Sequence, residues 1–481
     1  MIPHATQSPL PLEGSGEAST ICALATTPGG ALGIIRISGP QALSICGSIC
    51  RGITPETSPN TVHFTRITNG TEVIDECMVS VFKAPHSYTG EDSVEISCHG
   101  SRYVLNRVLS LLVEHGCRMA NPGEYTQRAY LNGKLDLTQA EAVADLIAST
   151  NRATHRLAIS QLRGGISTEL SHLREQLLKL TSLLELELDF SEHEDLEFAD
   201  RTELQSLAQT IDLHITRLAN SFEAGQAMKQ GIPVAIIGKT NVGKSTLLNR
   251  LLHEERAIVS DIHGTTRDTI EDTIDLQGVT FRFIDTAGIR QTTDQVELIG
   301  ISRTYAAIEK ARIVLWVIDA EPTLEELNDI KERCGGKSLI IIQNKIDKQS
   351  DVISLPEETN NSPVLPHYSK MGKDTCYPIL PISAKSGQGI EALEQSIFQA
   401  VHLPTITDSD IIITNARHYD ALQRAHAHLT RIIDGLHTQL SSDLLAEDLR
   451  LTLDTLAEIT GGQITTNEIL GNIFKNFCVG K

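Results

Sequence analysis

The sequence has no excess of positive charge, no long apolar run and no clustered cysteines, and each absence excludes a class of protein. It carries 41 Lys and Arg against 61 Asp and Glu, a formal net charge of −20. Wrapping of nucleic acid requires Lys and Arg in excess, so any RNA contact must use a local patch or a partner. The longest apolar runs, at 232–237 and 313–318, have the length of a strand and cannot span a bilayer.

The cysteines and the first residues indicate a cytoplasmic protein with no membrane attachment. The nine cysteines are odd in number and scattered, as expected for free thiols in a reducing compartment. Cys46 and Cys50 have no Cys or His cluster beside them that would suggest a metal site. Residues 1–19 mix Pro, Ser, Gly and Glu without an apolar core, which predicts a flexible extension rather than a signal peptide.

The length of 481 residues predicts roughly three domains. Residues 20–136 mix short β-branched runs with one helical stretch and should form an α/β domain. Helical periodicity begins where Thr138 and Glu141 form a possible capping box, breaks at Gly164 and continues to 229. Residues 230–404 alternate buried strands with amphipathic helices, as in a doubly wound sheet, and 405–481 are helical again. We expect the two helical segments to pack as one domain, with the doubly wound domain inserted between them.

A phosphate-binding loop opens the inserted domain. The sequence GKTNVGKS at 238–245 follows a buried strand and runs into a helix, the context that this motif requires. Backbone N–H groups should close on the phosphates, Lys244 should reach the β- and γ-oxygens, and the Ser245 hydroxyl should bind Mg²⁺. The predicted nucleotide contacts of this loop are Asn241, Val242, Gly243, Lys244, Ser245 and Thr246.

Two further segments are typical of a nucleotide hydrolase. The sequence DTAG at 285–288 follows a strand, where Asp285 would hold Mg²⁺ through water and Gly288 would sense the γ-phosphate. Before it, Thr266 would complete the Mg²⁺ shell, with Thr265 as the close competitor. The predicted contacts of these segments are Ser260, Asp261, Ile262, His263, Gly264, Thr265, Thr266, Asp285, Thr286, Ala287 and Gly288.

The base should be guanine. The sequence NKID at 344–347 places a carboxylate, Asp347, where it can accept from guanine N1–H and the 2-amino group, and adenine offers neither donor. The sequence SAK at 383–385 would present a backbone N–H to guanine O6. The predicted base contacts are Asn344, Lys345, Asp347, Ser383, Ala384 and Lys385. Together the motifs predict a GTP hydrolase.

The catalytic group is left open by the motifs alone. The position after Gly288 is Ile289, which cannot orient a water molecule by hydrogen bonding. Arg290, Asp294 and Glu297 are candidates, and each could equally be a solvated loop charge. Transition-state charge could be met by Arg267 or Arg290, or by a monovalent cation bound to Asn241, which could also simply stabilise its own turn.

Beyond the GTPase motifs, the chain resembles the MnmE (TrmE) family of tRNA modification GTPases over nearly all of its length after residue 20. The marks are TPG at 27–29, IRISG at 35–39, TGED at 89–92, PGEY at 122–125, AYLNGKLDL at 129–137 and the terminal FCVGK at 477–481. This resemblance implies an N-terminal domain that binds a tetrahydrofolate derivative, 5-formyl or 5,10-methylene. Arg36, Glu95, Lys134 and Lys481 would contact it. Cys478 could be a nucleophile or a buried structural thiol.

The resemblance also assigns the hydrolytic residues. Glu297 would orient the attacking water and act with Lys244 as the catalytic pair. A potassium ion would stand in for an arginine finger, held by Asn241, Ser260, Ile262 and Thr265. Ser260 departs from the more usual Thr, but its backbone carbonyl could still coordinate.

The partners follow from the same resemblance. A homodimer would pair its GTPase domains face to face around potassium, so that hydrolysis depends on dimerisation. The flavoprotein MnmG (GidA) would join it in a heterotetramer or larger complex, supply FAD and NADH, and carry most of the tRNA contact. The product would be carboxymethylaminomethyl or aminomethyl groups at C5 of wobble uridine. The alternative is a regulatory GTPase of ribosome assembly or membrane signalling, with the flanking domains as docking modules. The Pro/Ser-rich stretch 354–374 is predicted to be a flexible insertion.

Overall fold

The computed structural model describes residues 19–190, 201–254, 272–284, 305–348, 367–370, 376–401 and 411–462, and positions 473, 474, 477 and 480. Two compact units are present. Unit 1 comprises Met1–Ala148, Leu157–Ala219 and Ala416–Lys481, and unit 2 comprises Ser149–Arg156 and Asn220–Asn415. The predicted extension 1–19, apart from Ser19, and most of the predicted insertion 354–374 lie outside the described residues. No described helix is long and apolar enough to cross a membrane.

Unit 1 begins with a six-stranded sheet in the order β3-β4-β5-β2-β1-β6. The strands are β1 (Ile21–Leu24), β2 (Leu32–Ser38), β3 (Thr61–Asn69), β4 (Glu72–Phe82), β5 (Ser93–His99) and β6 (Arg118–Met119). Helices α1 (Ala42–Ile49) and α2 (Arg102–Glu114) contribute to one hydrophobic core with inward side chains of the sheet such as Ile35 and Ile96. Alternation along each strand turns the neighbouring residues to the other face, where Arg36 of β2 lies opposite Glu95 of β5.

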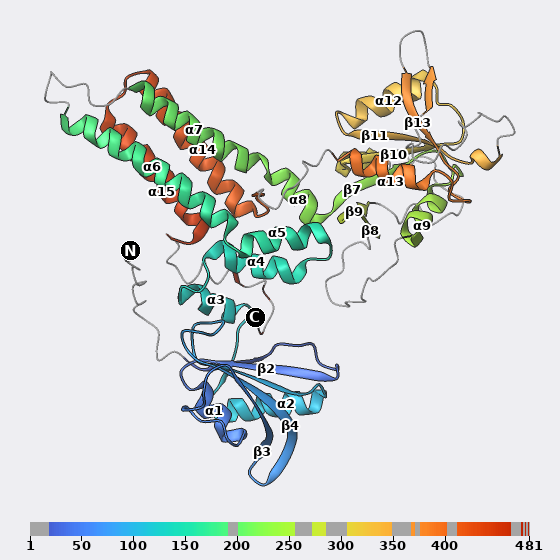
Figure 1. Ribbon diagram of the computed structural model, residues 1–481. Coiled ribbons are helices and arrows are strands. Elements are labelled where there is room, and N and C mark those ends of the chain that lie inside the picture. The colour runs from blue at the N-terminus through green and yellow to red at the C-terminus, as the bar shows by residue number, and fades with distance from the viewer. Residues whose placement is uncertain are drawn as a thin grey trace, which may run out of the picture. The chain divides into compact units, whose positions relative to one another are not determined.

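The remaining helices of unit 1 come from two distant parts of the sequence (Figure 1). They are α3 (Glu124–Leu131), α4 (Leu137–Ala148), α6 (Gly165–Phe190), α7 (Arg201–Asn220), α14 (Ala416–His437) and α15 (Ser442–Thr460), and α5 (Arg152–Leu162) crosses the boundary between the units. Helix α15 packs against α6, and α14 meets α7 where His426 Nδ1 lies 2.6 Å from Asp212 Oδ1. The predicted packing of two helical segments into one domain is confirmed. Gly164, with a φ of +84°, lies between α5 and α6 at the predicted break.

The predicted capping box at the start of α4 was wrong. Helix α4 begins at Leu137, so Thr138 already lies within it. Asp136 Oδ1 instead accepts from the Gln139 N–H at 2.9 Å, and Gln139 Oε1 accepts from the Asp136 N–H at 3.0 Å. Both pairs fit the sequence pattern of a capping box, but Glu141 lies in an ion pair with Arg417 of α14.

The C-terminal residues of the chain pack against its N-terminal domain. Phe474 is buried with Leu137 of α4. Gly123 has a φ of +68°, and a Cβ there would lie 2.8 Å from the Phe477 Cβ. Gly480 has a φ of +95°, and a Cβ there would lie 2.4 Å from the Leu24 carbonyl oxygen. Two glycines are therefore required for this close approach, because a side chain at either position would collide.

Unit 2 contains a seven-stranded sheet in the order β12-β13-β11-β10-β7-β9-β8. Its strands are β7 (Ile232–Ile237), β8 (Asp272–Leu276), β9 (Val279–Phe283), β10 (Ile313–Ile318), β11 (Ser338–Gln343), β12 (His367–Lys370) and β13 (Cys376–Pro381). The central strands are parallel and the edge strands β8 and β12 pair antiparallel.

Alternate residues of β7 enter different cores. Val234 and Ile236 join the core that includes α9 (Lys244–Glu254) and α13 (Ile390–Gln399), whereas Ala235 and Ile237 join the core that includes α12 (Leu324–Cys334). Both faces of the sheet are therefore covered, and the predicted doubly wound sheet is confirmed. Helix α8 (Phe222–Gln230) precedes β7, and a 3₁₀ turn, Ile346–Lys348, follows β11.

The corrected cap of α4 predicts a difference between two substitutions at Asp136. Asp136→Ala removes the acceptor for the Gln139 N–H and should destabilise unit 1 by about 1–2 kcal/mol. Asp136→Asn keeps an acceptor oxygen at the cap and should stay close to wild type. The urea midpoint, followed by far-UV circular dichroism, measures both, and equal midpoints for the two variants would contradict the assignment.

Candidate functional site

The phosphate loop connects β7 to α9 in a conformation that requires glycine at two places. Gly238 has a φ of +143°, and a Cβ there would lie 2.2 Å from the Val317 carbonyl oxygen. Gly243 has a φ of +103°, and a Cβ there would lie 2.2 Å from Asn344 Nδ2. Asn241 also has a positive φ, +61°, and is exposed. The loop therefore leads into the N-terminus of α9, where backbone N–H groups and the helix dipole favour phosphate.

Lys244, predicted to bind the phosphates, folds back over this loop. Its Nζ donates to the Gly238 carbonyl at 2.6 Å and to the Lys239 carbonyl at 2.7 Å. Burial lowers the pKa of Lys244. An anion in the loop would oppose that shift, because an opposite charge favours the ammonium form. The side chain is thus already held at the place where negative charge is expected.

Asn344 links the phosphate loop to the predicted base-binding loop. Its side chain is buried; Nδ2 donates to the Val242 carbonyl at 2.8 Å, and Oδ1 accepts from the Ala384 N–H at 3.0 Å. The sequence predicted Asn344 as a nucleotide contact, and the structure adds this structural link between two loops. One side chain fixes the distance between the phosphate half and the base half of the site.

Asp347 is prepared as an ionised acceptor. Ser383 Oγ donates to Asp347 Oδ1 at 2.7 Å, and this hydrogen bond lowers the pKa of the Asp347 carboxyl group. The carboxylate is exposed, as a base-reading group must be. Lys345 has a φ of +66°, and its Nζ lies 3.1 Å from Asp319 Oδ2. The ionised carboxylate suits the N1–H and 2-amino donors of guanine.

One further side chain contacts the base-binding loop and was missed in the sequence. Arg250 of α9 donates from Nη2 to the Lys385 carbonyl at 2.6 Å and from Nε to the Ala384 carbonyl at 3.3 Å. No motif marks this position, because the contact joins residues 134 and 135 positions apart in the chain.

Part of the predicted nucleotide site lies outside the described residues, and these predictions stay predictions. The set comprises Ser260, Asp261, Ile262, His263, Gly264, Thr265, Thr266, Asp285, Thr286, Ala287, Gly288 and Glu297. Within the described ranges, no group of three or more His, Cys, Asp or Glu side chains could hold a metal ion. A magnesium ion bound by hydroxyls and nucleotide phosphates does not need such a group.

A second candidate site lies around Arg36, on the face of the unit 1 sheet opposite the core that α1 and α2 form. Its guanidinium contacts Glu95 Oε1 from Nη2 at 2.7 Å and from Nε at 2.9 Å. Nη1 donates to the Gly480 carbonyl at 3.2 Å, and Cζ lies 5.6 Å from the ring centroids of Tyr88 and Tyr125. The structure thus brings two predicted folate residues together beside the C-terminal segment.

The other predicted folate residues are placed less completely. Lys134 Nζ donates to the Pro85 carbonyl at 3.0 Å, and a Cβ at Gly90 would lie 3.3 Å from the Lys134 Cγ. Lys134 therefore contacts the loop that carries Tyr88. Lys481 and Cys478 lie outside the described residues, although Gly480 beside Lys481 contacts Arg36.

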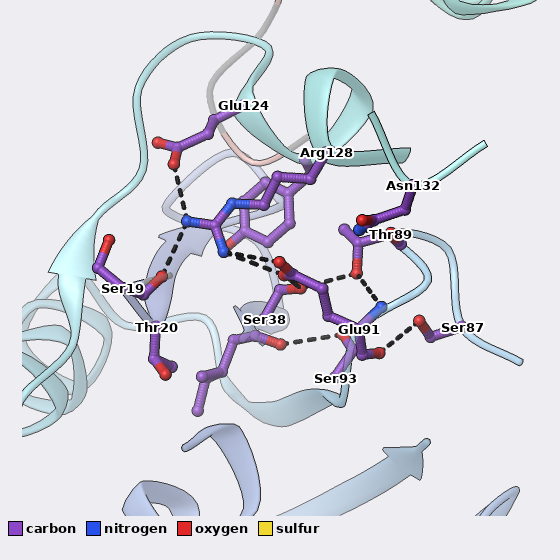
Figure 2. A network of polar contacts seen from close by, with 12 residues as sticks. Ser19, Thr20, Ser38, Ser87, Thr89, Glu91, Ser93, Glu124, Arg128 and Asn132 are labelled. Atoms are coloured by element: carbon purple, nitrogen blue, oxygen red, sulfur yellow. Dashed lines mark hydrogen bonds and ion pairs between the residues drawn. The ribbon is translucent and has the colours of Figure 1, made fainter. Parts of the chain in front are cut away.

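Figure 2 shows a network of ion pairs and hydrogen bonds that fixes the loop carrying Tyr88. Arg128 of α3 donates to both carboxylate oxygens of Glu91 at 3.1 and 3.0 Å, to Glu124 at 3.0 Å and to the Ser19 carbonyl at 2.8 Å (Figure 2). Glu91 also accepts from Ser38 Oγ at 2.8 Å. Burial alone would raise the pKa of Glu124, but the hydrogen bonds from Arg118, Asn121 and Arg128 lower it. The sequence noted TGED and PGEY only as marks of a resemblance, and here they tie the loop to α3.

The chemistry around Arg36 fits a flat heterocycle with an anionic tail. Tyr88 is exposed, and its hydroxyl lies 2.9 Å from Thr126 Oγ1, so the ring is held at the surface. The Arg36 and Glu95 side chains retain 17% and 28% of their exposure, so a ligand could reach both. A cation, a carboxylate and an aromatic face together suit a ligand that offers a carboxylate, N–H donors and a ring.

Comparisons with known proteins agree on one family. The model described as MnmE helical domain matches residues 137–478, and the model described as GTP-binding protein TrmE N-terminus matches residues 20–134. The tRNA modification GTPase MnmE of Bacteroides thetaiotaomicron is 53% identical over 471 residues, covering 96% of this chain and 99% of that protein. The tRNA modification GTPase MnmE of Bacteroides fragilis is 54% identical over 474 residues, covering 96% of this chain and 99% of that protein.

Among solved structures, the similarity is weak. The G domain of the T. maritima FeoB iron transporter shares 21% identity and covers 36% of this chain and 99% of that chain, with a TM-score of 0.23. A score this low supports no inference about function.

Proposed function

Because the chain belongs to the MnmE (TrmE) family of tRNA modification GTPases, we propose that its GTP hydrolysis drives modification of the wobble uridine in tRNA. It is a GTP hydrolase. The observation that carries the proposal is the preformed nucleotide site, in which Asn344 joins the phosphate loop to the base-binding loop. Such a site binds one nucleotide in one orientation, with the guanine at Asp347 and the phosphates at Lys244.

The phosphate end of the nucleotide would be bound by the phosphate loop, and further residues would hold Mg²⁺ and the attacking water. The loop from Gly238 to Ser245 would hold the phosphates by backbone N–H groups, with Lys244 neutralising the charge that develops during transfer. Ser245 and Thr266 would hold Mg²⁺, which would supply Lewis-acid stabilisation. Glu297 would orient the attacking water.

We further propose that a potassium ion completes the catalytic site. Asn241, Ser260, Ile262 and Thr265 would hold it, and it would supply the positive charge of an arginine finger. The exposed position of Asn241 in a left-handed backbone conformation supports this role, because an exposed side chain can be reached by a cation. The site would be complete only when two GTPase domains of a homodimer face each other.

The N-terminal domain would supply the one-carbon unit. A 5-formyl- or 5,10-methylene-tetrahydrofolate would lie at Arg36, Glu95, Lys134 and Lys481, where the Arg36–Glu95 pair and Tyr88 support its binding. With the flavoprotein MnmG (GidA), which would bring FAD and NADH, the product would be carboxymethylaminomethyl or aminomethyl uridine. The charge of −20 supports tRNA binding mainly through that partner.

We also propose a cytoplasmic location. Seven of the cysteines in the described parts of the chain are free and buried, as expected in a reducing compartment. Cell fractionation would check this, and recovery in a membrane or secreted fraction would count against it.

The potassium proposal predicts a salt-specific rate. At equal ionic strength, kcat for GTP should be at least about tenfold higher in potassium than in sodium, because the cation stabilises transition-state charge. Glu297→Ala should lower kcat about a hundredfold while GTP still binds, because only the positioned water is lost. Asp294→Ala, a neighbouring acid, is the matched control and should resemble wild type. Equal rates in both salts would remove Asn241 from its proposed role.

The folate proposal predicts that Arg36 and its counterpart Arg66 behave differently. Both form cross-strand pairs with a glutamate in the same sheet, Arg66 with Glu76 at 3.0 Å. Arg36→Met should weaken binding of 5-formyl-tetrahydrofolate at least about tenfold, because a charge-assisted contact is lost. Arg66→Met should bind it like wild type. Calorimetric titration of both variants, after matched melting midpoints are verified, measures this.

The partner proposal is tested in the same pair of variants. Nucleoside mass spectrometry of tRNA incubated with the chain, the flavoprotein with FAD, 5,10-methylene-tetrahydrofolate, glycine or ammonium as the amine donor, NADH and GTP should show modified uridine for Arg66→Met and little for Arg36→Met. Without the flavoprotein the chain should bind tRNA only weakly and in a salt-sensitive way. Tight, salt-resistant tRNA binding by the chain alone would contradict the proposed role of the partner.

A further inference from the structure

The guanidinium of Arg250 donates hydrogen bonds to two carbonyl groups of the base-binding loop. Nη2 donates to the Lys385 carbonyl at 2.6 Å and Nε to the Ala384 carbonyl at 3.3 Å. Gly387 lies beside it, since a Cβ there would be in van der Waals contact with the Arg250 Cζ at 3.7 Å. Two consecutive carbonyl groups of one loop are therefore oriented toward one cation on α9.

The orientation of a carbonyl group fixes the N–H on the far side of the same peptide. The Ala384 carbonyl and the Lys385 N–H belong to one planar trans peptide group, so they point in opposite directions. The Ala384 N–H is already used, because it donates to Asn344 Oδ1 at 3.0 Å. Within the described parts of the chain, the Lys385 N–H has no acceptor. It is therefore the backbone donor of this loop that remains for a ligand.

A cation on the carbonyl oxygen also strengthens that donor. Hydrogen bonds in series polarise one another, and a charged donor polarises the peptide more than a neutral one. The oxygen of guanine that faces this loop, O6, is an acceptor and matches such a donor. Adenine carries an amino group at the same position, which would oppose it.

We propose that Arg250 is a positioning residue for base selection, which orients and polarises the Ala384–Lys385 peptide so that its N–H reads the guanine O6. Arg250 does not touch the nucleotide. Its effect therefore differs from that of Asp347, which reads the N1–H and 2-amino edge of the base. The O6 edge and the N1–H and 2-amino edge of the base are therefore read by different groups. Substitutions of Arg250 and of Asp347 should be distinguishable with base analogues.

The test uses the full-length protein and three nucleotides: GTP, 6-thio-GTP, in which a weakly accepting sulfur replaces O6, and ITP, which keeps O6 and lacks the 2-amino group. Arg250→Met keeps the length of the side chain and removes the donors. It should weaken GTP and ITP binding in parallel, each about tenfold, and 6-thio-GTP binding much less. The ratio of 6-thio-GTP to GTP dissociation constants should fall several-fold, while the ITP to GTP ratio stays constant. Arg250→Lys can donate well to only one of the two carbonyl groups. Its ratio of 6-thio-GTP to GTP dissociation constants should therefore lie between those of the wild type and Arg250→Met.

Arg333→Met is the matched control in the same unit. Arg333 lies on α12, where Nε donates to Asp329 Oδ1 at 2.9 Å, and its substitution should leave both ratios at wild-type values. An unchanged 6-thio-GTP to GTP ratio in Arg250→Met would overturn the proposal. A parallel loss of all three nucleotides with a lower melting midpoint would also overturn it, because that pattern indicates a general structural brace. If Arg250→Met fails to fold, the ratio in Arg250→Lys decides by the same criterion. Absence of GTP binding by the wild-type chain would instead contradict the GTPase assignment itself.

Discussion

The buried amide of Asn344 is the contact on which the nucleotide site depends. It satisfies a carbonyl of the phosphate loop and an N–H of the base-binding loop with one side chain. An unsatisfied buried polar group costs about 1–3 kcal/mol, so separation of the two loops is opposed from both ends of the amide. The absence of a side chain at Gly243 allows this approach, because a Cβ would lie 2.2 Å from Asn344 Nδ2. Asn344 thereby sets the spacing between the phosphate loop and the base-binding loop.

In unit 1, ion pairs hold a loop in place. Arg128 and Arg118 balance Glu91 and Glu124, so a partly buried ion cluster is neutral overall and holds the loop with Tyr88 against α3. Removing one partner of such a cluster leaves an uncompensated charge, which is far more costly than the pair itself is stabilising. The C-terminal segment closes the same region, since Gly480 contacts Arg36 across 444 positions of sequence. Gly480, near the C-terminus, is thus brought beside Arg36, one of the residues proposed to bind folate.

Local patterns predicted much of this arrangement, and contacts between distant residues were not predictable. The fold class, the inserted doubly wound sheet and the phosphate loop follow from periodicity and from the local GKTNVGKS motif, whereas the contacts that require Gly238 and Gly243, with Val317 and Asn344, are distant in sequence. The cap of α4 was misassigned to Thr138 because Asp136–Gln139 and Thr138–Glu141 fit the same pattern, and the pairing of Glu141 with Arg417 is invisible in sequence. No sequence motif indicates the roles of Arg250 and Arg128. The predicted residues between 255 and 271 and between 285 and 304 lie outside the described residues and stay predictions.

Base selection by Asp347 tests the account most directly, because both the GTPase assignment and the alignment through Asn344 require guanine at that carboxylate. Steady-state hydrolysis of GTP and of xanthosine triphosphate should be compared in the wild type and in Asp347→Asn. Xanthine carries an oxygen in place of the 2-amino group, so an amide donor suits it where a carboxylate suits guanine. The account predicts that the preference changes from GTP to xanthosine triphosphate in the variant. A variant that keeps the wild-type preference for GTP would show that the base is bound elsewhere and would contradict the account.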